Sequence, residues 1–237
     1  MESTTTTTEK TSPISTPVAI LLSGVLIAGA VMYGLVYTPQ GKVGAEPTGT
    51  EESAGVPIPK VTAEDHVRGD VASAELVLVE YSDLECPYCS QFHPTVQKLK
   101  NDFGGRVAWV YRHFPLSQIH PDAVPAAVAS ECVAKLKGND AFWEFIDGVF
   151  ANQANIGTQL YHNLGGKQGI SKADLDACIE EGSVQAKIEQ QFNDAVAAGG
   201  RGTPYTVILN NKGETVGVFP GAIGYPQGKA QLDGLLK

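Results

Sequence analysis

The sequence is short of positive charge and of cysteine. It has 17 lysines and arginines against 26 aspartates and glutamates, which gives a net charge of −9. That balance argues against nucleic acid or an anionic membrane surface as the main partner. No internal repeat is visible. The four cysteines fall as one close pair, Cys86 and Cys89, and two distant singles, Cys132 and Cys178.

The first 62 residues carry no pattern typical of a packed domain. Residues 1–17 are rich in Thr and Ser and are expected to be disordered. Residues 18–37 contain no charge, and as a helix they would span ~30 Å, enough to cross the hydrocarbon core of a bilayer. Residues 38–62 are rich in Gly, Pro and Glu and are expected to form a flexible linker. Residues 63–237 have the size of one domain.

Two interpretations fit the apolar run at 18–37. We expect an uncleaved transmembrane anchor, because the run continues to Tyr37 and its start lacks a strongly basic region. The alternative is a cleaved signal peptide, with Ala28-Gly29-Ala30 as the cleavage site. Lysines lie on both sides of the run, so the flanking charges do not decide its orientation.

The remaining pattern alternates between strands and helices. The nearly continuous apolar run at 74–81 predicts a strand buried on both faces. Apolar residues at helical spacing predict a helix at 87–103. Further strands are expected at 106–113, 206–209 and 215–219, and further helices at 121–137, 140–152, 171–181, 184–198 and 226–236. The order predicts an α/β domain with a block of helices in its middle.

Cys86-Pro87-Tyr88-Cys89 stands where the first strand gives way to the first long helix. A cysteine in the first turn of a helix receives free N–H groups and the positive end of the helix dipole. That favours the thiolate, which is the nucleophile in disulfide exchange. Pro87 suits the first helical position, since its missing N–H is not needed there. Cys89 lies one turn into the helix, so we expect Cys86 to attack and Cys89 to resolve the mixed disulfide.

Three other interpretations of the pair are weaker than a redox role. A structural disulfide seldom opens a helix directly after a buried strand. A zinc or copper site would need more ligands, yet no second Cys-x-x-Cys exists and only His93 shares that helical face. Two unremarkable thiols rank last. A redox dithiol is therefore the leading hypothesis.

The context of the pair resembles the DsbA-like branch of the thioredoxin superfamily. The motifs that carry the resemblance are 81–89 (YSDLECPYC) with Phe92 and Pro94, 111–116 (YRHFPL), Phe142-Trp143 and Gly202-Thr203-Pro204. The resemblance implies a thioredoxin-like α/β fold with an inserted helical domain at about 117–199, here preceded by one transmembrane helix. It implies no bound cofactor or metal.

The resemblance also assigns roles to several residues. Pro204 matches the cis-proline that faces the dithiol, and Thr203 before it presents its backbone to a client chain. Pro87 and Tyr88 are expected to contact the client as well. Glu80 matches the family's buried acidic residue, and the apolar run before it leaves no polar face for it to occupy. A buried Glu80 would have a raised pKa and relay a proton to or from Cys89.

Three functions follow as hypotheses. The first is an oxidase that donates disulfides to exported proteins, located at the cell membrane with its catalytic domain outside the cytoplasm. By resemblance, a quinone-linked membrane protein would reoxidise it. The second is a reductase or isomerase, because Tyr88 offers no positive charge where the strongest oxidants carry histidine. The third is a tethered metal-binding or chaperone module.

Cys132 and Cys178 each lie in a stretch expected to be helical. An oxidising compartment would bridge the two thiols if they meet, so we expect a structural disulfide. The alternative is two buried free thiols that act as small apolar residues.

Overall fold

The computed structural model describes residues 57–237. The expected disordered tail, the expected membrane anchor at 18–37 and most of the expected linker lie outside the described residues. Within residues 57–237, none of the helices has both the length and the apolar character needed to cross a membrane.

A five-stranded sheet with the order β1-β3-β2-β4-β5 forms the centre of the domain. β2 pairs with β3 in parallel and with β4 in antiparallel orientation. Every residue of β2 is buried, which is the state that its continuous apolar run predicts. The strands are β1 (His66–Arg68), β2 (Leu76–Ser82), β3 (Val107–His113), β4 (Tyr205–Asn210) and β5 (Thr215–Phe219).

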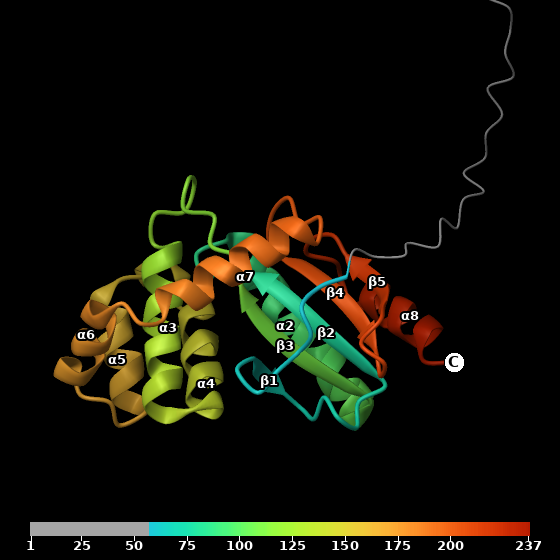
Figure 1. Ribbon diagram of the computed structural model, residues 1–237, viewed down its shortest axis with the longest axis horizontal. Coiled ribbons are helices and arrows are strands. Elements are labelled where there is room, and N and C mark those ends of the chain that lie inside the picture. The colour runs from blue at the N-terminus through green and yellow to red at the C-terminus, as the bar shows by residue number, and fades with distance from the viewer. Residues whose placement is uncertain (1–56) are drawn as a thin grey trace, which may run out of the picture. The chain divides into compact units, whose positions relative to one another are not determined.

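Helices lie against both faces of the sheet (Figure 1). Leu76 and Leu78 of β2 share one core cluster with residues of α2 and α8. The alternate residues Val77 and Val79 share a second cluster with residues of α7. Successive side chains of a strand point to opposite faces, so β2 contributes to both cores. The helices are α2 (Pro87–Phe103), α3 (Ala123–Lys137), α4 (Asn139–Phe150), α5 (Thr158–Lys167), α6 (Lys172–Glu181), α7 (Gln185–Ala197) and α8 (Tyr225–Leu235).

The helical insertion lies between β3 and β4 in the chain. In Figure 1, α3 to α6 gather at one end of the sheet, and α7 leads back from them across it. One strand and one α-helix were not predicted. β1 has only three residues, too few for a period. The last turn of α5 contains Gly165 and Gly166, and each glycine costs about 1 kcal/mol of helix propensity. Gly165 is there for packing, since a Cβ on it would lie 3.3 Å from Leu175.

The domain begins earlier than the expected boundary at residue 63. Ile58 and Val61, which were assigned to the linker, pack against the core cluster on the α7 side of the sheet. The Arg112 guanidinium donates hydrogen bonds to the carbonyls of Pro59 and Lys60, at 3.1 and 3.2 Å. Isolated apolar residues between prolines and lysines give no periodic signal, so the sequence did not predict these contacts of residues 58–61 with the domain.

Candidate active site

Cys86 is the residue that caps the N-terminus of α2. Its backbone is extended (φ −67°, ψ 123°), and Pro87 is the first helical residue. The Cys86 N–H donates to the Asp83 carbonyl at 3.1 Å, which fixes the turn between β2 and the helix. Both Cys86 and Cys89 are buried free thiols, whereas Pro87 and Tyr88 between them are exposed. The motif therefore places its two sulfurs at the start of α2 and its middle dipeptide toward solvent.

The two thiols differ in acidity. A hydrogen bond from the Cys89 thiol, with support from the backbone N–H groups of Cys89 and Tyr88, lowers the pKa of Cys86 to about 5 against the opposing effect of burial. Burial, reinforced by the neighbouring Cys86, raises the pKa of Cys89 well above its ordinary value. At neutral pH these shifts leave Cys86 as a thiolate and Cys89 as a thiol, and the thiolate is the nucleophile in disulfide exchange.

The Thr203-Pro204 segment lies directly before β4 and reaches the dithiol. The Cys86 Sγ is 3.5 Å from the Thr203 carbonyl oxygen, and the peptide bond between Thr203 and Pro204 is cis. Residues 202 and 203 are half-buried. The structure therefore brings together Cys86 and a backbone segment 117 residues away, as the resemblance implied.

Glu80 is fully buried on β2, on the side of the sheet that α2 covers. The Trp109 indole donates to Glu80 Oε2 at 2.9 Å, and Oε1 has no partner among the described residues. Burial raises the pKa of Glu80, with the nearby His93 acting in the opposite direction. Sequence reasoning missed Tyr111, which pairs with Glu80 across the parallel strands. Burial and the charges of Cys89 and Glu80 raise the pKa of the Tyr111 phenol, so its hydroxyl lies in electrostatic reach of both groups.

Gln153 is a second site residue that the sequence did not reveal. Its amide donates at 2.9 Å to the carbonyls of both Leu84 and Cys86. Gln153 belongs to the short 3-10 helix Gln153–Asn155 of the insertion. The insertion therefore holds the segment that carries Cys86, although 67 residues separate the two in the chain.

His93, the candidate third ligand of a metal site, is engaged elsewhere. Its Nε2 forms a 2.6 Å ion pair with Asp147 of α4, and its ring packs against Phe150 and Trp109. Within the described part of the chain, no group of three or more histidine, cysteine or acidic side chains is placed to hold a metal ion.

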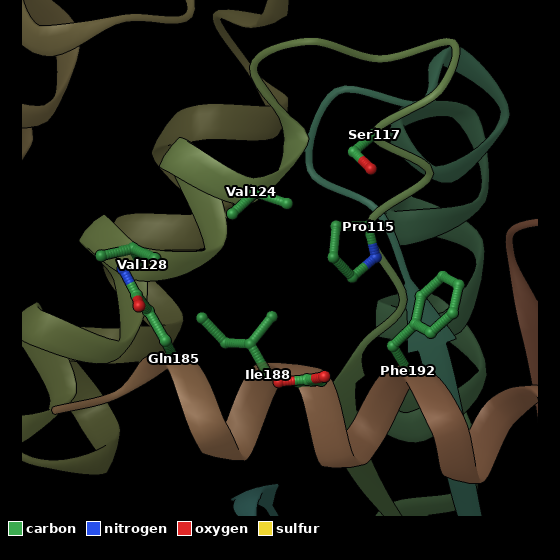
Figure 2. A pocket seen from close by; sticks show the side chains of 8 residues that line it. Pro115, Ser117, Val124, Val128, Gln185, Ile188 and Phe192 are labelled. Atoms are coloured by element: carbon green, nitrogen blue, oxygen red, sulfur yellow. The ribbon is translucent and has the colours of Figure 1, made fainter. Parts of the chain in front are cut away.

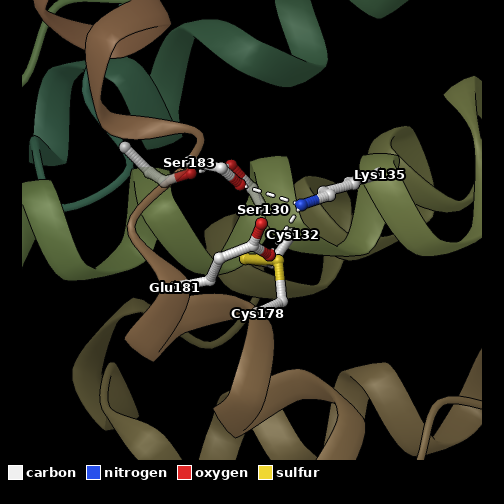
Figure 3. Close-up of a disulfide and its surroundings, with 7 residues drawn as sticks. Ser130, Cys132, Lys135, Cys178, Glu181 and Ser183 are labelled. Atoms are coloured by element: carbon white, nitrogen blue, oxygen red, sulfur yellow. Dashed lines mark hydrogen bonds and ion pairs between the residues drawn. A yellow bond between two sulfur atoms is a disulfide. The ribbon is translucent and has the colours of Figure 1, made fainter.

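Cys132 of α3 and Cys178 of α6 are joined by a disulfide, with their Cα atoms 5.8 Å apart (Figure 3). Beside it, the Lys135 ammonium donates to Glu181 at 2.7 Å and to Ser183 at 2.9 Å. A covalent bond and a surface ion pair thus connect the same two helices of the insertion.

An apolar pocket of about 440 Å³ lies between α3 and α7. Figure 2 shows Val124 and Val128 of α3 facing Ile188 and Phe192 of α7 across it, with Pro115 at its wall. Pro115 begins the segment 115–122, which also contacts Asp83 and Glu85, the residues just before Cys86.

The site holds a dithiol of unequal acidity at a helix start, opposite a backbone segment, and its core is a thioredoxin sheet with a helical insertion. These features define a thiol–disulfide oxidoreductase with a DsbA-like fold. The chain belongs to the thioredoxin family, whose sequence profile, described as Thioredoxin, matches residues 61–216.

Solved structures share this fold. DsbA2 of Pseudomonas aeruginosa is 27% identical, with a TM-score of 0.62 over 75% of this chain and 97% of that one. Oxidised BdbD of Bacillus subtilis is 21% identical, with a TM-score of 0.66 over 77% of this chain and 98% of that one. At 21% identity, the likeness to BdbD shows only that the fold is shared.

Curated relatives carry a different name. A Na(+)/H(+) antiporter NhaA 1 of Mycolicibacterium gilvum is 36% identical over 150 residues, 62% of this chain and 24% of the antiporter. An antiporter NhaA of Herminiimonas arsenicoxydans is 34% identical over 167 residues, 69% of this chain and 26% of the antiporter. The chain spans about a quarter of the length of these relatives, so their transport activity does not carry over to it.

Proposed function

We propose that this protein introduces disulfides into exported proteins by exchange through Cys86 and Cys89. The observation that carries the proposal is the unequal pair: a Cys86 thiolate with a pKa of about 5 beside a buried Cys89 thiol whose pKa is raised. A stable Cys86 thiolate is a good leaving group, which favours passing a disulfide on rather than keeping it.

The reaction begins from the oxidised dithiol. A client thiolate attacks the Cys86 sulfur, the bond between Cys86 and Cys89 breaks, and Cys89 leaves as a thiolate that takes a proton. A second client thiolate then attacks the client sulfur of the mixed disulfide. The client disulfide forms, and Cys86 leaves as a thiolate. The client loses two electrons, and the dithiol gains them.

Three groups assist these steps. The exposed Pro87 and Tyr88 contact the client, and the Thr203 backbone pairs with its extended chain. Glu80 supplies the proton that Cys89 takes, because its raised pKa lets it hold a proton closer to neutral pH than an ordinary carboxyl does.

We propose that the domain works outside the cytoplasm, tethered by the apolar run at 18–37. The disulfide between Cys132 and Cys178 supports an oxidising compartment, since disulfides are rare in the cytosol. A quinone-linked membrane protein then takes the two electrons from the reduced dithiol. A tether near the membrane would keep the domain close to such a partner.

The test is the reduction potential of the Cys86–Cys89 pair, measured by equilibration with glutathione. We expect a value between those of thioredoxin and DsbA, about −270 and −120 mV, together with disulfide formation in a reduced client. The buried Asp83 and the half-buried Glu85 oppose a thiolate and keep the potential below the upper limit. A value at or below that of thioredoxin would instead assign the protein to the reductases.

A further inference from the structure

Asp83 is a buried acid that touches both cysteines through its backbone. Its N–H donates to the Cys89 Sγ at 3.5 Å, and its carbonyl accepts from the Cys86 N–H at 3.1 Å. Its carboxylate is 1% exposed and accepts from the Glu85 N–H at 2.8 Å. A buried carboxylate charge this close to a thiolate would by itself raise the pKa of that thiol, so a cation that neutralises Asp83 would act in the same direction as the hydrogen bonds that lower the pKa of Cys86.

The neutralising group comes from the segment between β3 and α3. His120 Nδ1 lies 2.8 Å from Asp83 Oδ2, and the Leu116 N–H donates to the same oxygen at 2.8 Å. The Asp122 N–H donates to the Glu85 carboxylate. Residues 115–122 are thus bound to residues 83–85 at three points. This binding delivers one imidazole to the acid beside the dithiol.

The other four histidines of the chain pair with carboxylates outside residues 83–86. His66 and His113 contact Glu131, His93 contacts Asp147, and His162 contacts Asp176. His120 alone among the described histidines pairs with a carboxylate of the segment that leads into Cys86.

We propose that His120 is a positioning residue for the dithiol: its imidazolium neutralises Asp83 and thereby keeps Cys86 in the thiolate form. The proposal rests on the proposed function and deepens it. It also supplies the positive charge that Tyr88 lacks, from a position 34 residues beyond Cys86 in the chain.

The charges around His120 agree with this role. Burial lowers the pKa of His120, but the hydrogen bond to Asp83 and the charges of Asp83, Cys86 and Glu85 together raise it. Asp122 and Tyr161 of α5 carry the other titratable groups at this edge. Burial, and then the charges of Asp122 and Glu85, raise the pKa of Tyr161, and the Asp122 N–H donates to the Glu85 carboxylate. As pH rises through the raised pKa of His120, the imidazolium is lost, the Asp83 charge is uncovered, and the thiolate becomes less stable.

The first experiment compares His120→Gln with the unaltered protein. Thiolate absorbance against pH gives the pKa of Cys86, and equilibration with glutathione gives the potential. We expect the pKa to rise by about one unit. The equilibrium constant for oxidising glutathione should fall about tenfold, which corresponds to about 30 mV. His162→Gln is the control, because its imidazole is shielded about as well as that of His120, at 12% and 15% exposed, but its partner Asp176 is a surface carboxylate outside residues 83–86.

The second experiment separates charge from loop anchoring. Asp83→Asn removes the negative charge that His120 neutralises, so the double variant His120→Gln, Asp83→Asn should return the pKa of Cys86 to within a few tenths of the original. If His120 only anchored residues 115–122, the double variant would lose more contacts, and the pKa of Cys86 would move further from its original value. A shift that grows in the double variant, or no shift in His120→Gln alone, overturns the proposal. The proposed function fails separately, if the unaltered dithiol does not exchange with glutathione at all.

Discussion

Cys86 and Cys89 are three residues apart and both are free, whereas Cys132 and Cys178 are 46 residues apart and joined by a disulfide. Burial does not separate the pairs, because the exposed fractions of the four residues are 3%, 0%, 0% and 5%. What differs is the electrostatic setting. Cys86 meets free N–H groups at a helix start, while Cys132 lies inside α3, where the helix uses its own N–H groups.

The comparison teaches that cysteine reactivity in this domain follows from the groups that face the sulfur. One pair is placed at a junction between a strand and a helix, opposite the backbone of Thr203. The other joins two helices of the insertion and has no such neighbour among the residues described.

Removing the attacking sulfur has the largest expected effect. Cys86→Ser should abolish disulfide exchange, because no other thiol has a depressed pKa. Cys89→Ala should instead trap mixed disulfides with client proteins, since the attacking thiolate remains but the resolving thiol is gone. Non-reducing gels of the two variants after incubation with a client that already contains a disulfide would show this, because the Cys86 thiolate forms the mixed disulfide by displacing one of the client's thiolates. Trapping by Cys86→Ser rather than by Cys89→Ala would reverse the assignment.

Removing the second pair should affect stability alone. The double variant Cys132→Ser, Cys178→Ser should lower the free energy of unfolding by about 4 kcal/mol, the chain-entropy value for a loop of this length. Urea denaturation measures it, and the exchange rate of the folded variant should stay unchanged. Lys135→Ala is a useful comparison, because the exposed ion pair between the same helices should contribute less than about 1 kcal/mol. Slower exchange would tie the bridge to the dithiol.

Glu80→Gln should slow the steps that move a proton at Cys89 by about a hundredfold and flatten their pH dependence near neutrality. Burial raises the pKa of Glu80, so the carboxyl costs folding stability as pH rises from its ordinary to its raised pKa. The variant should therefore gain stability relative to the original at neutral pH but not in acid. Stopped-flow exchange and urea denaturation check the two effects. Glu75→Gln, an exposed acid near Arg106, is the control and should do neither.

Acid should protonate Cys86 and slow its reactions, and it should leave the disulfide between Cys132 and Cys178 intact. Because the pKa of Cys86 is about 5, the thiolate fraction is nearly complete at pH 7 and falls about tenfold by pH 4. The rate of iodoacetamide alkylation at Cys86 should fall by the same factor over that range. An alkylation rate that still rises above pH 8 would indicate an ordinary thiol instead.

The smallest expected effect comes from the exposed dipeptide. Tyr88→His would add a charge near Cys86, but the side chain is 62% exposed, and solvent weakens its field. We expect the reduction potential to rise by less than about 30 mV, or less than tenfold in the equilibrium constant. A larger rise would show that the mouth of the site, rather than Asp83 and His120, controls the acidity of Cys86.

The elements that position the dithiol could be predicted from the sequence because their signals are local. The bounds of α2 and β5 agree with the expectation at both ends, since an apolar period and clear breakers define each one. The position of Glu80 on a buried strand followed from the apolar run before it.

The residues that contact the dithiol and its flanking segment from distant parts of the chain could not be predicted. His120 and Gln153 reach the segment before Cys86 from 37 and 67 residues away, and neither lies in a periodic stretch. Tyr111 stood in one of the motifs that carry the resemblance, but its spacing gave no sign that it would pair with Glu80. Contacts of this kind depend on how the segments fold back on one another. The spacing of residues along the chain does not predict which distant segments will meet.

The position of the disulfide has a consequence for how the protein is made. β2 and β3 precede the insertion in the chain, and β4, which pairs with β2, follows it. Proteins are synthesised from the N-terminus, at about 5–20 residues per second. Both cysteines of the bridge therefore emerge before Pro204 and before β4, the strand that pairs with β2. The two thiols that form the bridge are thus available before the sheet beside the dithiol is complete.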